Sequence, residues 1–397
     1  MKGPFLQAAP LLVDIEKAGF EAFFVGGSVR DFLAGREIND VDIASSATPE
    51  EIKAIFPKTV DVGIEHGTVL VLYGGDSYEI TTFRTENGYS DFRRPDHVQF
   101  IRSLEDDLKR RDFTMNAMAM DKDGILYDPF NGQSAIQNKV IAAVGNPDER
   151  FGEDALRMIR AIRFVSQLGF RLEDSVIASI KNNAALLANV SVERLLVEFE
   201  KILAGPRQKE AIQLLIESGL YQCLPGLQDE EAALKAFNSL DIELENLHER
   251  WAVLIMMVQP PNLETFCRSW KMPVLLMKEI KRSAVLIRDH SDFLDDQLVL
   301  FYAGRVGAQS AARVKAVLEA GDPVAAAKRA EVNYDKLVIK TMNELEVNGR
   351  DLLAWSSLKQ GAWMKQALES ALKAVLSRQI DNNKAVIKGW LEQCNLI

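Results

Sequence analysis

The segment Asn39–Ala44 constrains the fold of this chain most, because carboxylates alternate there with apolar side chains. In a β-strand, residues two apart point to the same side, so Asp40 and Asp42 would project together while Val41 and Ile43 face a core. Two carboxylates on one face of a strand form a candidate site for a divalent cation. By itself, such a short acidic pattern would equally fit a surface turn or a helix cap.

A glycine-rich run before this strand changes the interpretation. Gly26 and Gly27 let the backbone approach an anionic group closely, while Ser28 and Arg30 supply hydrogen-bond donors for phosphate oxygens. A turn of this kind beside two aspartates predicts a site for a nucleoside triphosphate with Mg2+. The two carboxylates suit two Mg2+ ions, which would lower the pKa of an attacking hydroxyl and neutralise the transferring phosphoryl group.

The whole chain is expected to have an α+β fold with several domains, because its 397 residues exceed one ordinary domain. Short β-type runs separated by turns occupy residues 21–130, which a mixed α/β unit explains most simply. From about Asp148 onward the sequence indicates amphipathic helices broken at glycine and proline residues. The expected strands are Ala22–Val25, Val41–Ala44, Gly67–Tyr73, Tyr78–Phe83, His97–Ile101 and Thr114–Met120.

Composition limits the partners and the compartment. Lys and Arg number 47 against 57 Asp and Glu, a net charge of −10, so any surface for nucleic acid must be a local basic patch. The three cysteines lie far apart with no CxxC pair, which is typical of a reduced, cytoplasmic protein. No stretch approaches the ~18 apolar residues of a membrane span, and the first residues lack the pattern of a secretion signal. Neither secretion nor membrane insertion is expected.

A basic pair followed by an acid and an amide forms a second candidate segment. Arg110 and Arg111 precede Asp112 and Asn116, and together these side chains offer contacts to phosphate, ribose and a base edge. An ordinary charged loop would fit the same residues. Glu79, on a predicted strand, is a candidate third acid near the metal site, and a solvent-facing position would fit it equally well.

The segment Glu153–Arg163 is interpreted as a helix with one charged face. At about 100° per residue its apolar side chains form a stripe, and Asp154, Arg157, Arg160 and Arg163 fall in the opposite sector. Cytosine and adenine both present an exocyclic amine beside a ring-nitrogen acceptor, whereas guanine and uracil present a carbonyl beside an N–H.

These edges give the charged face a chemical use. Asp154 accepting from the amine and Arg157 donating to the ring nitrogen would select C and A, at about 1–3 kcal/mol per bidentate contact. Arg160 and Arg163 would lie further along the same helix face, within reach of phosphates or RNA. A solvated helix face with i,i+3 ion pairs is the alternative.

The segment Arg84–Asp96 is rich in Gly, Ser and Pro-type turn residues and has no apolar periodicity, so it is predicted to be a mobile loop. Arg84, Arg93 and Arg94 give it a basic character. A plain linker is the alternative.

Together these motifs resemble class II tRNA nucleotidyltransferases, the bacterial CCA-adding enzymes of the DNA polymerase β-like nucleotidyltransferase superfamily. The segments that carry the resemblance, in order and in spacing, are Gly26–Asp31 with Asp40–Ala44, Arg110–Ala117, Asp128–Gly132 and Glu153–Arg157. The resemblance implies an N-terminal nucleotidyltransferase head with a small mixed sheet, followed by all-α neck, body and tail domains. The expected boundaries are 1–145 for the head, 146–205 for the neck, 206–295 for the body and 296–397 for the tail.

The resemblance also implies roles around the reacting phosphate. Asp40 and Asp42 would hold the catalytic Mg2+ ions, and Gly27, Ser28 and Arg30 would hold the triphosphate. The implied reaction is attack of the 3′ hydroxyl of tRNA on the α-phosphate of CTP, twice, and then of ATP, with release of pyrophosphate.

The same resemblance implies how the base is read. Arg111 and Asp112 would face the incoming nucleotide and its ribose, with Asn116 in support. Asp154 and Arg157 match a protein template for C and A. Glu153 would orient Arg157, and Arg160 and Arg163 would assist.

Related activities remain as alternatives. Bacterial poly(A) polymerases share the head, but the segment Gly63–Thr68 resembles the form found in CCA-adding enzymes. Enzymes that add only CC lack the loop at Arg84–Asp96, which is present here at full length, and an enzyme that adds only A is a further variant. A non-catalytic RNA-binding protein would be expected to have lost a metal acid or a template residue. The sequence leaves open whether the protein is a monomer or a homodimer.

Overall fold

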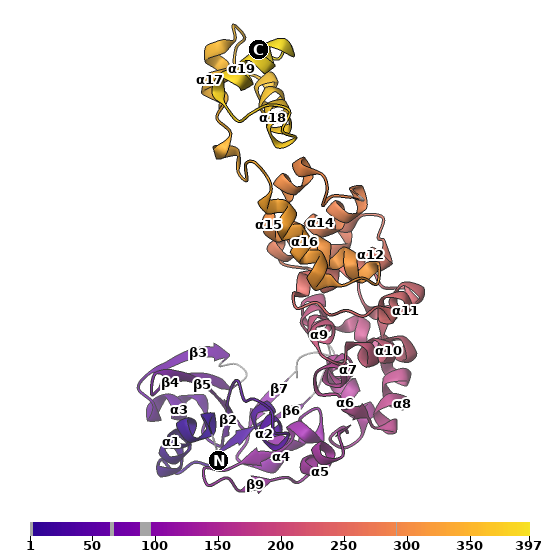
Figure 1. Ribbon diagram of the computed structural model, residues 1–397. Coiled ribbons are helices and arrows are strands. Elements are labelled where there is room, and N and C mark those ends of the chain that lie inside the picture. The colour runs from indigo at the N-terminus through magenta and orange to yellow at the C-terminus, as the bar shows by residue number, and fades with distance from the viewer. Residues whose placement is uncertain (1–2, 64–66, 88–96, 291) are drawn as a thin grey trace. The chain divides into compact units, whose positions relative to one another are not determined.

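The structure is a computed structural model that describes residues 3–63, 67–87, 97–290 and 292–397 (Figure 1). The chain forms two compact units, Met1–Glu231 and Ala232–Ile397. Within the described residues, strands occur only in the first unit, so the predicted α+β class is confirmed. The predicted division into head, neck, body and tail stays a prediction.

A seven-stranded sheet forms the centre of the N-terminal region, in the order β3-β4-β5-β2-β1-β8-β9. β2 and β5 pair in parallel, and the other pairs are antiparallel, so the sheet is mixed as predicted. Its strands are β1 (Ala22–Val25), β2 (Asp42–Ser45), β3 (Thr59–Gly63), β4 (Thr68–Tyr73), β5 (Asp76–Thr82), β8 (Ala119–Met120) and β9 (Leu126–Tyr127).

Short helices and one hairpin surround this sheet. The apolar face of the first helix is fully buried, and Phe5 of that helix packs on Phe24 of β1 with ring centroids 4.8 Å apart. A capping box between Thr48 and Glu51 fixes the start of the third helix. The elements are α1 (Pro4–Lys17), α2 (Gly27–Leu33), α3 (Pro49–Ile55), α4 (Leu104–Lys109) and α5 (Gly132–Gln137), with the hairpin β6 (Arg84–Asn87) and β7 (His97–Phe100).

The predicted strand Thr114–Met120 is wrong for most of its length. A 3-10 helix occupies Thr114–Asn116, and only β8 is extended. The reason is local: the Asp112 carboxylate accepts hydrogen bonds from the backbone N–H of Phe113 and the side chain of Asn116, which curls the chain. The sequence reading also missed β3, because this strand is mostly exposed and lacks a buried apolar face.

Helices follow from residue 147 to the end of the first unit. They are α6 (Pro147–Glu153), α7 (Leu156–Leu168), α8 (Asp174–Asn183), α9 (Val192–Ala204) and α10 (Gln208–Ser218), with a two-residue parallel pair, β10 (Val140–Ile141) and β11 (Arg171–Leu172). The predicted continuous helix through Glu153–Arg163 is wrong. The chain is extended at Asp154 (φ −135°, ψ 102°), where the side chain accepts a hydrogen bond from Leu156 N–H at 3.1 Å and so starts α7.

The second unit is helical throughout its described residues, apart from turns. Trp251 and Trp270 are fully buried in it, with ring centroids 5.1 Å apart. None of the helices that the structure describes combines the length and apolar character that a bilayer crossing needs. The helices are α11 (Glu231–Ser239), α12 (Leu247–Val258), α13 (Leu263–Ser269), α14 (Val274–Asp289), α15 (Gln297–Leu318), α16 (Pro323–Asp335), α17 (Gly349–Trp355), α18 (Ala362–Leu376) and α19 (Lys384–Gln393).

Candidate active site

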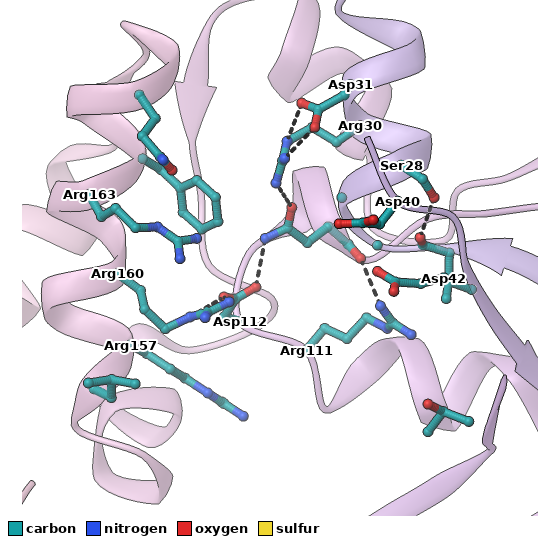
Figure 2. A pocket seen from close by; sticks show the side chains of 18 of the residues that line it. Ser28, Arg30, Asp31, Asp40, Asp42, Arg111, Asp112, Arg157, Arg160 and Arg163 are labelled. Atoms are coloured by element: carbon teal, nitrogen blue, oxygen red, sulfur yellow. Dashed lines mark hydrogen bonds and ion pairs between the residues drawn. The ribbon is translucent and has the colours of Figure 1, made fainter. Parts of the chain in front are cut away.

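A wide pocket of about 870 Å3 in the first unit brings most of the predicted site residues together (Figure 2). The predicted residues that line it are Gly27, Ser28, Arg30, Asp40, Asp42, Arg84, Arg111, Asp112, Asn116, Asp154, Arg157, Arg160 and Arg163. Glu79 and Glu153 do not line it. Arg93 and Arg94 lie outside the described residues.

The turn between β1 and α2 requires glycine at position 26. Gly26 has φ of +69°, and a Cβ there would lie 3.2 Å from Nη1 of Arg111 and 3.5 Å from Oδ2 of Asp42. The backbone therefore passes close to the aspartate that begins β2. The Ser28 hydroxyl donates to the carbonyl oxygen of Val25 at 2.9 Å and so anchors this turn.

The aspartate pair lies at the edge of the sheet, with a difference from the expected strand. Asp42 is the first residue of β2 and pairs with Val25, whereas Asp40 precedes the strand. Both side chains nevertheless point into the same part of the pocket (Figure 2). Burial raises the pKa of Asp42, and the nearby Glu79 and Asp40 raise it further, against the opposing effect of Arg111 and Arg30.

This crowding of carboxylates fits a bound cation. The negative charges of Glu79 and Asp40 raise the pKa of Asp42, and a bound cation would offset this repulsion and favour the ionised carboxylates. No three histidine, cysteine, aspartate or glutamate side chains converge on a metal position among the residues that the structure describes. The remaining ligands would therefore be phosphate oxygens and water, which Mg2+ commonly retains. Glu79 affects Asp42 electrostatically from β5.

Asp112 is a centre of hydrogen bonding rather than an open carboxylate. It accepts from the N–H of Phe113 at 2.8 Å, from Asn116 Nδ2 at 3.0 Å, and from Nε and Nη2 of Arg160 at 3.0 and 2.7 Å. Burial raises the pKa of Asp112, but the Arg160 guanidinium and the Asn116 amide outweigh burial and hold it well below its usual range. Asp112 therefore holds the guanidinium of Arg160 in a fixed position in the pocket lining.

Arg30 is held by three side chains. Its guanidinium pairs with both carboxylate oxygens of Asp31, at 3.0 and 2.8 Å, and its Nη1 donates to Oδ1 of Asn116 at 2.8 Å. It also lies over the ring of Phe164, 5.2 Å from the centroid. Sequence reasoning missed Asp31 and Phe164, although Phe164 lies four residues after Arg160, on the same side of a helix.

The two residues of the predicted base template retain unused hydrogen-bonding capacity. Arg157 Nη1 donates to Glu153 Oε2 at 2.9 Å and, at 3.4 Å, to the carbonyl of Arg150, and Nη2 donates to the carbonyl of Arg110 at 2.8 Å. A guanidinium carries five N–H donors, so within the described structure Nε and one hydrogen of Nη2 remain for a ligand. The predicted pairing of Glu153 with the arginine is confirmed as a contact.

The carboxylate of Asp154 is similarly half engaged. Oδ1 accepts from the N–H of Leu156 at 3.1 Å, and Oδ2 accepts from Nη2 of Arg194 at 2.6 Å. Each carboxylate oxygen has two acceptor positions, so capacity for an amine remains. The backbone carbonyl of Asp154 accepts from the N–H of Arg157 at 3.0 Å, which keeps the two residues within one turn.

Helix α9 supplies residues that the sequence reasoning did not assign to the site. Arg194, Glu198 and Lys201 lie three or four residues apart, so they share one helix face, and that spacing was the available signal. Glu198 is buried and pairs with Nη1 of Arg163 at 3.0 Å. Burial, followed by the neighbouring Arg160, lowers the pKa of Arg163 to about 10.

The pocket lining carries more cations than carboxylates although the chain is acidic, and Asp107, Glu153 and Glu198 outside the lining pair with four of these cations. Nine cationic side chains line it against five carboxylates. The cations are Arg30, Arg84, Arg110, Arg111, Arg157, Arg160, Arg163, Arg194 and Lys201, and the carboxylates are Asp31, Asp40, Asp42, Asp112 and Asp154. Cationic side chains are therefore concentrated at this pocket.

Family models match three parts of the chain. Residues 22–142 match a poly A polymerase head domain, residues 169–230 match a probable RNA and SrmB-binding site of polymerase A, and residues 242–391 match a putative tRNA nucleotidyltransferase domain 2. Together they cover both compact units.

Whole-chain comparisons extend this similarity. The CCA-adding enzyme of Geobacillus sp. (strain WCH70) is 45% identical over 401 residues, covering 100% of this chain and 99% of that protein. The crystal structure of the Bacillus stearothermophilus CCA-adding enzyme in complex with CTP superposes with a TM-score of 0.92 at 43% identity, covering 100% of this chain and 98% of that one. The Thermotoga maritima CCA-adding enzyme complexed with tRNA_CCA shares the fold, with a TM-score of 0.61 at 19% identity over 97% of this chain and 94% of that one.

Proposed function

The chain belongs to the CCA-adding tRNA nucleotidyltransferases, and from this membership we propose that it adds C, C and A to the 3′ end of tRNA from CTP and ATP, releasing pyrophosphate. One observation carries the proposal: a single basic pocket contains both the aspartate pair and the half-engaged pair Asp154 and Arg157. The first pair serves nucleotidyl transfer, and the second serves the choice of base.

Asp40 and Asp42 would hold two Mg2+ ions. When bound, these ions supply an activated 3′ hydroxyl and neutralise the charge that develops on the transferring phosphate. The turn at Gly26 and Gly27 leaves room for the triphosphate, because a side chain at Gly26 would crowd Arg111 and Asp42. Arg30 contributes positive charge there from a position fixed by Asp31 and Asn116.

Arg157 and Asp154 would read the base by its Watson–Crick edge. Nε and the remaining hydrogen of Nη2 on Arg157 donate to acceptors of cytosine or adenine, and the spare acceptor positions of Asp154 receive the exocyclic amine. Glu153 and the carbonyl of Arg110 orient the guanidinium, and Arg194 orients the carboxylate. Guanine and uracil would place a carbonyl against Asp154 and an N–H against Arg157, leaving both unpaired.

Arg160 and Asp112 form an ion pair in the lining of the same pocket. Arg160 is 31% exposed on its side chain and pairs with the buried Asp112, so it can present charge to the nucleotide without moving. Figure 2 shows Arg157, Arg160 and Arg163 in a row on one helix, across the pocket from the aspartate pair. We assign to Arg157 and Arg160 the support of the base and sugar.

The activity is tested by incubating the protein with a tRNA that lacks CCA, together with CTP, ATP or both, and sequencing the product ends. The proposal predicts CC ends with CTP alone and CCA ends with both nucleotides. Long A tails would identify a poly(A) polymerase, and ends that stop at CC or gain only A on a CC primer would identify a partial activity. No product with any combination would refute the proposal.

A further inference from the structure

The pocket extends beyond the base-reading pair along two helices that run in the same direction. Asp154 at the start of α7 contacts Arg194, and near the other end Ser166 Oγ donates to the carbonyl of Ile202 on α9 at 2.7 Å. Ten residues separate Arg157 from Gln167, about 15 Å of helix at 1.5 Å per residue. Both Gln167 and Lys201 line the pocket at this far end.

This far end contains one lysine without a described partner, Lys201, and one arginine, Arg163, with an unused donor. Lys201 is exposed and makes no hydrogen bond or ion pair with any residue that the structure describes. The Arg163 side chain is only 9% exposed, and its Nε has no hydrogen-bond partner within the described part of the chain. Glu198 neutralises Arg163 through Nη1, whereas no described carboxylate pairs with Lys201.

We propose that Lys201, Gln167 and Arg163 form a subsite for a phosphate of the RNA strand, one step back from its 3′ end. This inference rests on the proposed function, because an RNA strand must enter the pocket for its 3′ hydroxyl to react. Lys201 supplies the point charge, Gln167 an amide donor, and Arg163 the buried cation beneath them.

Charge balance favours RNA over the nucleoside triphosphate as the source of this phosphate. The triphosphate has its own turn at Gly26 and Gly27 and would be neutralised by the metal ions held at Asp40 and Asp42. On α7 and α9, Arg157, Arg160, Arg163 and Arg194 each pair with a carboxylate, so Lys201 is the pocket cation that, among the described residues, remains available to a second anion. The second substrate of the reaction, a nucleic acid strand, brings that charge.

The test compares Lys201→Ala and Lys201→Arg with the matched control Lys181→Ala. Lys181 is an exposed lysine on α8 that does not line this pocket. Binding of a tRNA lacking CCA is measured without nucleotide over a series of KCl concentrations, and CTP binding is measured separately without RNA. Neither measurement requires catalysis, so failure of this subsite is distinguished from failure of the proposed activity.

Lys201→Ala should weaken tRNA binding about three- to tenfold at moderate salt and reduce the slope of log Kd against log salt by about 0.7, as expected for one lost contact to a single strand. CTP affinity should not change, Lys201→Arg should restore both RNA readouts, and Lys181→Ala should match the wild type. An unchanged salt slope would overturn the subsite. A loss of CTP affinity in Lys201→Ala would overturn its assignment to RNA, because the group would then bind the triphosphate.

Discussion

Replacing Arg157 by methionine tests the base template, because methionine keeps an unbranched apolar stem and removes every donor. In the structure three donors of Arg157 hold the side chain against Glu153 and two backbone carbonyls, and two donors remain for the base. Losing the contact to the base should cost about 2–3 kcal/mol of discrimination, within the range for a bidentate contact to a base edge. Since about 1.36 kcal/mol is tenfold, the preference for CTP over UTP should fall about 30- to 150-fold.

Arg150→Met is the matched control for this substitution. Arg150 also pairs with Glu153, at 2.5 Å, but it does not line the pocket. The assay is single-turnover incorporation with CTP and with UTP on a tRNA lacking CCA, giving the ratio of kcat/KM values for each variant. Arg150→Met should keep the wild-type ratio within about threefold, which is less than 1 kcal/mol. Arg157 does not read the base if Arg157→Met also keeps that ratio, or if both variants lose it equally.

Four further predictions concern the aspartate pair, its pH dependence, the loop and the packing at Gly132. Asp42→Ala should abolish addition of C and A alike, and normal turnover at saturating Mg2+ would contradict the metal assignment. Because the pKa of Asp42 is raised, protons compete with metal more strongly as pH falls, so the Mg2+ concentration for half-maximal rate should rise on acidification. Shortening the segment Arg84–Asp96 should spare C addition and impair A addition in a nucleotide-incorporation assay, and equal loss of both would count against a switching role. Gly132→Ala should destabilise the protein by about 1–3 kcal/mol in a thermal-shift or denaturant assay, because its Cβ would lie 2.3 Å from the carbonyl oxygen of Thr114. Gly152→Ala, with nothing within 4 Å, is the control and should leave stability equal or higher.

The sequence predicted which residues line the pocket where the informative residues are close together along the chain. The glycine turn and the aspartate pair lie within 17 residues, from Gly26 to Asp42, and local strand geometry was enough to join them. Glu153 and Arg157 are four residues apart on the helical reading, and the structure contains their contact at 2.9 Å. Short-range periodicity is the kind of signal that a single sequence carries.

Contacts between residues far apart along the chain could not be predicted from this short-range periodicity. Arg160 and Asp112 are 48 residues apart, and their pairing depends on how α7 packs beside the 3-10 turn after Asp112. Arg194 reaches Asp154 across 40 residues for the same reason. Hydrophobic spacing specifies that each helix has a polar face, but not which other charged group that face will meet.

The break between α6 and α7 shows a second limit. Apolar residues continue with helical spacing through Asp154, so periodicity predicted one helix. Asp154 instead uses its own side chain to accept the Leu156 N–H, and capping of this kind competes with helix continuation. The consequence is functional, because the carboxylate then projects from a helix start next to Arg157 rather than from the middle of a helix.

Base reading by Asp154 and Arg157 can be observed in a pair of crystal structures of this protein, one with CTP and one with ATP, both with Mg2+. In both structures we expect Asp154 to accept from the exocyclic amine and Arg157 to donate through Nε or Nη2 to the ring acceptors, at hydrogen-bond distances of about 2.7–3.2 Å. The contacts of Arg157 to Glu153 and of Asp154 to Arg194 should persist, and the triphosphate and metal ions should lie at Asp40 and Asp42. A base that contacts neither Asp154 nor Arg157, or that contacts them in only one of the two complexes, would rule out this pair as the template for both C and A.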